Sequence, residues 1–247
     1  MLSEEGMVNG MEKKNKTVAI VLAAGQGKRM HSHVQKQYLM LHDRPVIFYA
    51  LNRFQQSFID EIILVVSKGE EDYCRTEIVE KYNFTKVAKI VEGGRERYHS
   101  VANGLAAIGG DGYVFIHDGA RPFITEDILL RAYETVKEYN ACVVGMPVKD
   151  TIKVVDKNCF AKQTPNRETL WQVQTPQVFE IRLAKEAYDK LLANEEDLKK
   201  QGIKITDDAM VVETLMRQPV KLVEGSYENI KITTPEDLDI AYALLSD

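Results

Sequence analysis

Residues capable of phosphate chemistry gather in short segments rich in glycine and positive charge. The first is AAGQGKRM, residues 23–30, which ends an apolar run and contains Lys28 and Arg29. Because glycine has no Cβ atom, such a turn lets a ligand approach the backbone closely. The spacing fits neither a Walker A loop nor a dinucleotide fingerprint, which needs glycine where Met30 stands. Taken alone, the segment is equally compatible with an ordinary strand-to-helix turn.

Further charged segments follow other apolar runs. They are Glu92–Arg97 (EGGRER) with Ser100 beyond it, His117–Pro122 (HDGARP) and Pro147–Thr151 (PVKDT). Cations outnumber carboxylates in these loops, with Lys28, Arg29, Lys36, Arg97 and Arg121 against chiefly Asp118. Mg²⁺ commonly takes one or two carboxylates and completes its shell with phosphate oxygens and water. The balance therefore predicts a polyanionic ligand held with one divalent cation.

The sequence shows no sign of a nucleophilic triad. It lacks a GxSxG motif. Its cysteines fall in segments predicted to be a strand, a helix or the irregular stretch at about 148–176. His31 and His33 have no nearby carboxylate partner, which favours solvated loop residues over metal ligands. We expect phosphoryl or nucleotidyl transfer, in which positioning and charge neutralisation do most of the catalysis.

Alternating strand and helix patterns must position these loops. Apolar runs predict strands at 18–22, 61–66, 87–91, 113–117 and 142–148. Helical spacing predicts helices at 46–54, 70–82, 96–108 and 125–139, the last with Thr125 as its cap. This order predicts an α/β, Rossmann-like, mostly parallel sheet with helices on both faces. Ligands in such sheets bind beyond the carboxyl ends of the strands.

The alternation breaks after Pro147. Residues 151–155 and 170–174 resemble strands, but 156–167 contain turn formers and no crossover helix. We therefore expect a protruding antiparallel β-arm at about 148–176 that serves as an interface. Beyond the arm, the pattern predicts helices at 180–194, 207–215 and 234–245, and strands at 220–224 and 229–232.

Composition limits the remaining classes. The 247 residues carry a net charge of −5, which argues against general nucleic-acid binding. No apolar run approaches the ~20 residues of a membrane span, and residues 1–16 lack the apolar centre of a signal peptide. We expect a disordered extension at 1–16, a single domain at 17–247, and a cytoplasmic location, because the three cysteines form no disulfide or zinc pattern.

Eight motifs identify a resemblance that covers about Thr17 to Leu245. They are AAGQGKRM, KQY, GG-x-x-R-x-x-S, HDGARPFI, VKDTIK, QTPQVF, TDDA and EGSYENIKITTPEDLD, in that order. Together they resemble the 2-C-methyl-D-erythritol 4-phosphate cytidylyltransferases, the CTP-dependent enzymes of non-mevalonate isoprenoid synthesis. Ribitol-5-phosphate cytidylyltransferases share the PNR and QTPQ elements. The AAG, HDGA and VKDTIK sequences favour the methylerythritol family.

The resemblance implies a role for each matching residue. Nucleotide binding would fall to Ala23, Ala24, Gly25, Gln26, Gly27, Gly94, Arg97, Ser100, Asp118 and Gly119. Arg29, Lys36 and Lys231 would act on the phosphates as catalytic cations. Arg121, Thr151, Arg167 and Thr175 would bind the sugar-alcohol phosphate, and Asp118 would hold Mg²⁺ or another divalent cation. The arm would make a homodimer, so that some acceptor contacts come from the partner chain.

Two positions depart from the family pattern. Many relatives have proline where this chain has Gln35, so the approach of Lys36 is expected to be less rigid. Many also carry aspartate where Arg95 stands, so an acceptor for the cytosine amino group is expected to be missing or replaced by backbone.

The main alternative class is a non-catalytic nucleotide-binding regulator. Such a protein would need the glycine loop but not Thr151, Arg167 and Lys231, so their joint presence favours an enzyme. We expect the acceptor's phosphate oxygen, already an anion, to attack the α-phosphorus of CTP in line without an enzymatic base.

Overall fold

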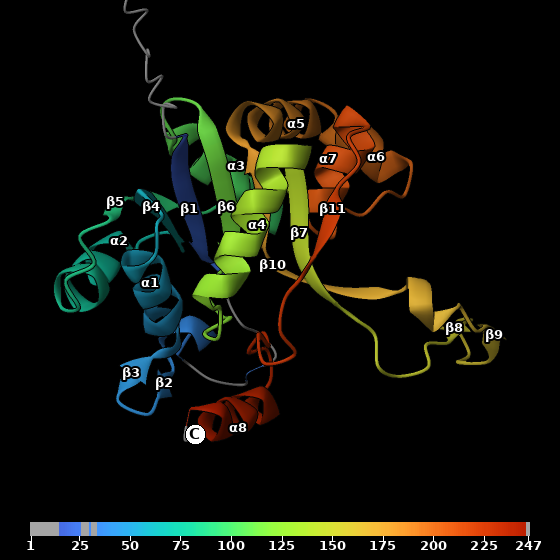
Figure 1. Cartoon of the computed structure of the whole chain (residues 1–247), viewed down its shortest axis with the longest axis horizontal. Helices are drawn as coiled ribbons and strands as arrows, with labels where there is room; N and C mark the ends of the chain where they lie inside the picture. Colours follow the sequence, from blue (N-terminus) through green and yellow to red (C-terminus); the bar gives the residue numbers. More distant parts are fainter. Residues whose placement is uncertain (1–14, 26–29, 31–33, 246–247) are drawn as a thin grey trace, which may run out of the picture.

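A seven-stranded sheet forms the body of the protein. The computed structural model describes residues 15–25, 30 and 34–245 (Figure 1). The strand order is β11-β7-β10-β6-β1-β4-β5. The strands are β1 (Lys16–Ala23), β4 (Glu61–Val66), β5 (Val87–Glu92), β6 (Gly112–Asp118), β7 (Ala141–Pro147), β10 (Trp171–Glu180) and β11 (Lys221–Glu224). All neighbours are parallel except β10, which pairs antiparallel with both β6 and β7.

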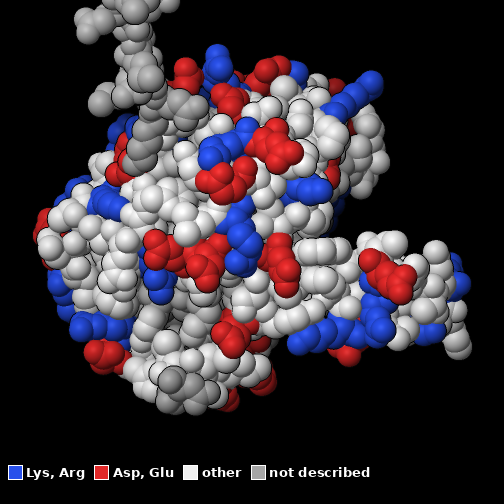
Figure 2. Space-filling model, in the orientation of Figure 1, with Lys and Arg blue, Asp and Glu red and all other residues white. Residues whose placement is uncertain are grey.

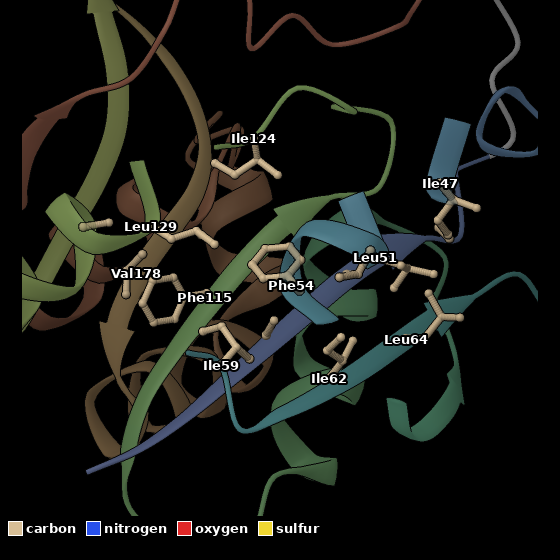
Figure 3. Packing of buried hydrophobic residues seen from close by; sticks show 14 of the residues in the cluster. Ile47, Leu51, Phe54, Ile59, Ile62, Leu64, Phe115, Ile124, Leu129 and Val178 are labelled. Atoms are coloured by element: carbon tan, nitrogen blue, oxygen red, sulfur yellow. The ribbon is translucent and has the colours of Figure 1, made fainter. Parts of the chain in front are cut away.

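Helices cover both faces of this sheet, which confirms the predicted fold class. They are α1 (Val46–Gln56), α2 (Glu71–Tyr73) with a π-helical continuation (Cys74–Glu80), α3 (Arg97–Ala107), α4 (Glu126–Tyr139), α5 (Ile181–Ala193), α6 (Glu195–Lys200), α7 (Asp208–Met216) and α8 (Pro235–Leu244). Alternate residues of β1 enter opposite cores, so the strand is apolar throughout. Ile47, Leu51 and Phe54 of α1 lie over one face (Figure 3), and α3, α5 and α7 pack on the other.

Local capping explains where several helices begin. The Thr125 hydroxyl accepts a hydrogen bond from the backbone of Ile128, as the sequence predicts. Asp207 caps α7 in the same way through Met210. At α8, Thr234 and Asp237 form a reciprocal capping box, with proline in the first turn.

Three elements differ from the predictions. The predicted strand at 229–232 is wrong: Asn229 is buried and bonds to Gln174 and Thr175, and this segment forms loop contacts instead of a ladder. Strand β10 continues to Glu180, beyond the predicted 170–174, because the polar residues of QTPQ interrupt the apolar pattern without ending the strand. Helix α6 was not predicted, because its six residues are nearly all charged and show no apolar periodicity.

The predicted N-terminal extension and the first strand meet at a different residue from the one expected. Residues 1–14 of the predicted extension lie outside the described residues, and Lys16 already belongs to β1. A short hairpin, β2 (Met40–Leu41) and β3 (Arg44–Pro45), precedes α1.

Within the part of the chain that is described, no helix has the length and apolar character needed to cross a bilayer.

The segment between β7 and β10 projects from the body as an arm (Figure 1). No crossover helix occurs there, as predicted, and β8 (Val154–Val155) pairs with β9 (Ala161–Gln163) in a small antiparallel hairpin. The predicted pairing is wrong: β9 lies within 156–167, where only turns were expected, and the strand expected at 170–174 belongs to β10 and pairs with β7. Figure 2 shows Lys and Arg side chains along this arm. The arm also exposes the large apolar side chains of Ile152, Val154, Val155 and Phe160, and the adjoining start of β10 exposes Trp171 and Val173.

Candidate active site

A cavity of about 850 Å³ lies at the carboxyl ends of β1, β4, β5 and β6. This volume suits a ligand of nucleotide size. Its lining is rich in charge, with five cations and three carboxylates among seventeen residues. The lining residues are Leu22, Ala24, Gly25, Lys36, Gln37, Ser67, Lys68, Glu92, Gly93, Gly94, Arg95, Glu96, Arg97, Ser100, Asp118, Ala120 and Lys231.

The cavity brings together many of the residues singled out in the sequence. Those that line it are Ala24, Gly25, Lys36, Gly94, Arg97, Ser100, Asp118 and Lys231. Gln26, Gly27 and Arg29 lie outside the described residues. Ala23 is buried in the core, and Gly119 packs its backbone against Leu22.

Gly25, in the described part of the first glycine-rich segment, lines the cavity. A Cβ atom placed on Gly25 would meet no described atom within 4 Å. The described residues around Gly25 therefore do not require a glycine at this position. Gly93, in contrast, is required by packing, because a Cβ atom there would lie 2.4 Å from the Cβ atom of Ala24.

The second glycine loop is held by the helix that follows it. The backbone N–H of Gly94 donates to the Ser100 hydroxyl at 3.0 Å, and that of Gly93 donates to the Val66 carbonyl at 2.7 Å. Ser100 therefore shapes the loop from α3. A side chain on Gly94 would collide with His99, which limits this position to glycine.

Asp118, at the end of β6, is the electrostatic centre of the cavity. Its Oδ2 accepts a hydrogen bond from Lys231 Nζ at 2.6 Å, and its Oδ1 lies 3.3 Å from Arg97 Nε. Burial by itself would raise the pKa of Asp118, but Arg97, Lys231 and Arg121 hold this pKa far below its ordinary value. The carboxylate therefore stays ionised among cations.

Arg97 is fixed by a second carboxylate that the sequence analysis did not assign. Its Nη1 and Nη2 donate to Asp208 Oδ1 and Oδ2 at 2.6 and 2.8 Å, a bidentate pair. Asp208 is fully buried and also accepts a hydrogen bond from Tyr188. The TDDA motif contains Asp208, and two adjacent acids at a helix start were the available signal.

The lysines reach the cavity from different segments. Lys36 begins a 3₁₀ turn (Lys36–Tyr38), and its Nζ donates to the Ile232 carbonyl at 3.0 Å. Lys231 is held by its neighbour Ile232, which is buried in a small cluster with Leu41 and Val46. Two segments almost 200 residues apart in sequence thus place their ammonium groups in one cavity.

The sequence that forms this charged cavity matches a protein family whose reaction is known. Residues 17–247 match the family described as 2-C-methyl-D-erythritol 4-phosphate cytidylyltransferase. The chain belongs to this family. The cytidylyltransferase of Lachnoclostridium phytofermentans is 49% identical over 94% of this chain and 97% of its own length. That of Lachnospira eligens is 53% identical over 90% of this chain and 96% of its own length.

Solved structures agree with the family assignment. The 4-diphosphocytidyl-2C-methyl-D-erythritol synthase of Anaerococcus prevotii superposes with a TM-score of 0.80 at 35% identity, covering 94% of this chain and 97% of that one. The Francisella tularensis enzyme gives 0.74 at 30% identity, with 92% and 98% coverage. The predicted enzyme class, a cytidylyltransferase of the non-mevalonate isoprenoid pathway, is confirmed.

Thr175 lies beside the cytidylyltransferase cavity with its hydroxyl already engaged. The Asp118 backbone N–H donates to Thr175 Oγ1, and that hydroxyl contacts His117 Nδ1, each at 3.1 Å. Burial lowers the pKa of His117 to about 4, so the ring is neutral at neutral pH. Its Nε2 lies 3.1 Å from the Arg121 carbonyl, which can only accept, so Nε2 carries the proton.

We expect Thr175→Val to destabilise the fold by about 2 kcal/mol, because it leaves the Asp118 amide and His117 Nδ1 without a buried partner. Urea unfolding at pH 7.5 measures this change. Thr175→Ser keeps the hydroxyl and is expected to lose less. Equal stabilities of the valine variant and the wild type would show that these bonds contribute nothing.

The other residues that were expected to bind the acceptor take two positions. Arg121 is partly buried, with its Nη1 donating to the Asn229 carbonyl at 2.7 Å, and its Nε has no hydrogen-bond partner among the described residues. Thr151 and Arg167 are exposed on the arm and do not line the cavity of their own chain. Arg167 Nη1 donates to the Lys149 carbonyl at 2.8 Å.

Arg95 forms an ion pair with Glu195, which lies outside the cytidylyltransferase motifs. Its Nη2 lies 3.3 Å from Glu195 Oε1 at the start of α6. Tyr98 donates to the same carboxylate at 2.7 Å, and His99 contacts it at 3.1 Å. Hydrogen bonds lower the pKa of Glu195 to about 2, and the bond from Lys199 has the largest effect. Arg95 is thus engaged at the rim and supplies no acceptor to a base.

Sequence reasoning also missed the contribution of β4. Ser67 and Lys68 follow its last residue and line the cavity. The rule that ligands bind beyond the carboxyl ends of strands predicts this position as well, since β4 ends at Val66. The signal was present, although a serine and a lysine in a turn carry little information by themselves.

Proposed function

We propose that the cavity transfers CMP from CTP to 2-C-methyl-D-erythritol 4-phosphate, giving 4-diphosphocytidyl-2-C-methyl-D-erythritol and pyrophosphate. The observation that supports this most directly is the pairing of Lys231 and Arg97 with the ionised carboxylate of Asp118 in a cavity that Lys36 also lines. A cavity in which cations outnumber carboxylates, and in which one ionised carboxylate lies among the cations, suits a triphosphate and its counter-cation.

The transfer needs no enzymatic base. A phosphate oxygen of the acceptor forms a bond to the α-phosphorus of CTP, and the bond from that phosphorus to the bridging oxygen breaks. The bonding electrons leave with pyrophosphate. Negative charge accumulates on the phosphorus oxygens as these bonds exchange. Lys36 and Lys231, whose ammonium groups already lie at the cavity, would neutralise this charge.

The residues present fit a divalent cation that also binds nucleotide phosphates. No cluster of three or more His, Cys, Asp or Glu side chains suited to a metal occurs among the described residues. Asp118 is a carboxylate that lies in contact with two cavity cations, and Mg²⁺ needs only one or two carboxylates when phosphates supply other ligands. When bound, the cation would offset triphosphate charge. Lys231, now on Asp118 Oδ2, would then be available to the reacting phosphate.

We propose that the arm forms a homodimer and completes the acceptor site. It exposes Phe160 by 70% and Val155 by 50%, which is costly for a hairpin in water unless another surface covers them. Thr151 and Arg167 sit on this arm and away from the cavity of their own chain. A two-fold pair of chains would carry each arm to the partner's cavity.

We also propose that the enzyme works in a reducing cytoplasm. Its three cysteines, Cys74, Cys142 and Cys159, are all free. Burial raises the pKa of the Cys74 thiol to about 11 and that of Cys142 to about 12, so neither is a reactive thiolate at neutral pH.

Purified protein with CTP and Mg²⁺ tests the reaction, when methylerythritol phosphate and ribitol 5-phosphate are supplied in parallel and pyrophosphate release is followed. We expect release with methylerythritol phosphate and little with ribitol 5-phosphate. A reversed preference would assign the enzyme to the polyol-phosphate class. CTP binding without release from either acceptor would indicate a regulator.

Arg167→Lys is expected to raise the KM for the sugar phosphate more than the KM for CTP, because lysine cannot present the planar donor fork of a guanidinium to a phosphate. Steady-state kinetics with each substrate varied measure the two constants. Arg182→Lys, at an exposed arginine on α5, serves as the matched control. Equal increases in both constants would count against a contact with the acceptor.

Subunit mixing tests whether Arg167 acts across the dimer. Co-expressed Lys36→Ala and Arg167→Ala chains form some mixed dimers, in which one cavity combines an intact Lys36 with an intact partner arm. Random pairing then restores roughly a quarter of wild-type sites. Sedimentation velocity checks that the chains pair. No recovery in sedimenting dimers would place Arg167 in its own chain's site.

A further inference from the structure

Gln35 occupies a backbone conformation that proline would adopt. Its φ is −62° and its ψ is 140°, and a pyrrolidine ring fixes φ near −65°. Its carbonyl accepts the Tyr38 N–H at 2.9 Å, which closes the turn that begins at Lys36. Its own N–H makes no hydrogen bond with the described residues. The conformation therefore has to be held by something other than a ring.

The side-chain amide nitrogen of Gln35 restrains this backbone conformation through a hydrogen bond to Glu70. Its Nε2 donates to Glu70 Oε1, just before α2. The other oxygen of Glu70 accepts the Tyr38 hydroxyl at 3.0 Å, so one carboxylate contacts both ends of the turn. Tyr38 is buried, and its oxygen is also 3.0 Å from Cys74 Sγ. Burial raises the pKa of Tyr38, so the hydroxyl remains a donor.

The amide oxygen ties the same turn to the ends of two strands. Gln35 Oε1 accepts from Gln37 Nε2 at 2.5 Å and lies 3.2 Å from the Ser67 hydroxyl. Gln37 is buried and also donates to the Ala23 carbonyl, and Ser67 lies 3.2 Å from the Ala24 carbonyl. A single side chain thus links the Lys36 turn to the ends of β1 and β4.

We propose that Gln35 is a positioning residue for CMP transfer, because its amide network fixes the turn that presents Lys36 to the cavity. This inference rests on the proposed catalytic role of Lys36. Gln35 touches no substrate in this scheme, and it does not line the cavity. It performs by hydrogen bonding the restriction that a proline ring would impose covalently.

Three variants separate positioning from general stability. Gln35→Ala removes both the network and any restriction of φ, so we expect kcat to fall about tenfold with less than a threefold change in the KM for CTP. Gln35→Pro removes the network but restores the restriction of φ, so kcat is expected to stay within about threefold of wild type. Gln56→Ala, at an exposed glutamine ending α1, is the matched control and should leave kcat unchanged.

Combination with Lys36→Ala decides whether the effect passes through that lysine. If Gln35 acts by positioning Lys36, Gln35→Ala causes no further loss of kcat in the Lys36→Ala background. A full additional tenfold loss there would overturn the proposal, as would Gln35→Ala with kcat within twofold of wild type. Near-normal kcat of Lys36→Ala alone would instead overturn the role of Lys36, so the two failures are distinguishable.

Discussion

Lys36→Ala is expected to fold normally, retain CTP binding and lose about 10²–10³ in kcat, since this is the usual cost of removing a preorganised charge contact to a transition state. Lys36 reaches the cavity from a short turn, and its Nζ is held at the Ile232 carbonyl. Its charge is therefore in place before the reaction begins. Single-turnover and steady-state kinetics measure the loss, and urea unfolding measures the stability.

Lys68→Ala provides the matched control for Lys36. Lys68 lines the same cavity, but its side chain is 85% exposed. An exposed lysine contributes at most roughly 0.5 kcal/mol to stability, and we expect its loss to leave kcat nearly unchanged. Comparable losses in the two variants would indicate a general effect of cavity charge. A Lys36→Ala variant with near-normal kcat would assign the transition-state charge to Lys231 or to the cations near the first glycine loop.

Asp118→Asn is expected to raise the Mg²⁺ concentration needed for half-maximal rate and to lower kcat at saturating Mg²⁺ by about 10²-fold. The amide keeps the shape of the side chain but not its charge. Lys231 and Arg97 would then face the cavity without their carboxylate. Arg97 keeps its bidentate pair with Asp208, so we expect the fold to survive. Mg²⁺ titrations of the initial rate at saturating CTP measure the effect.

Glu92→Gln is the control for Asp118. Glu92 lines the same cavity from the end of β5, and its side chain is about half exposed, 3.8 Å from Lys68. We expect its Mg²⁺ dependence to match that of wild type. Undiminished turnover of Asp118→Asn at limiting Mg²⁺ would remove Asp118 from the metal site. A shift of equal size in Glu92→Gln would mean that total cavity charge, not one ligand, sets the dependence.

The sequence alone determined the architecture and the place of the site. Apolar runs such as Glu61–Val66 are buried on both faces, and this burial is what makes them continuous enough to recognise as parallel strands. Because parallel strands end at one edge, small and charged residues that follow different strands had to meet there. The sequence therefore places Gly25, Gly94 and Asp118 at one edge of the sheet, and all three line the cavity.

Only the tertiary structure decided which side chains hold one another. Arg97 and Asp208 are 111 residues apart, and no local pattern encodes their bidentate pair. The Thr175 hydroxyl is committed to the backbone of Asp118 because β10 enters antiparallel beside β6, an insertion hidden by the polar QTPQ sequence. Gln35 appeared only as a missing proline until its amide was seen to bridge Glu70 and Ser67. Periodicity reports which face of an element is buried, whereas a hydrogen bond depends on the distance and direction between atoms of separate elements, and packing alone sets these.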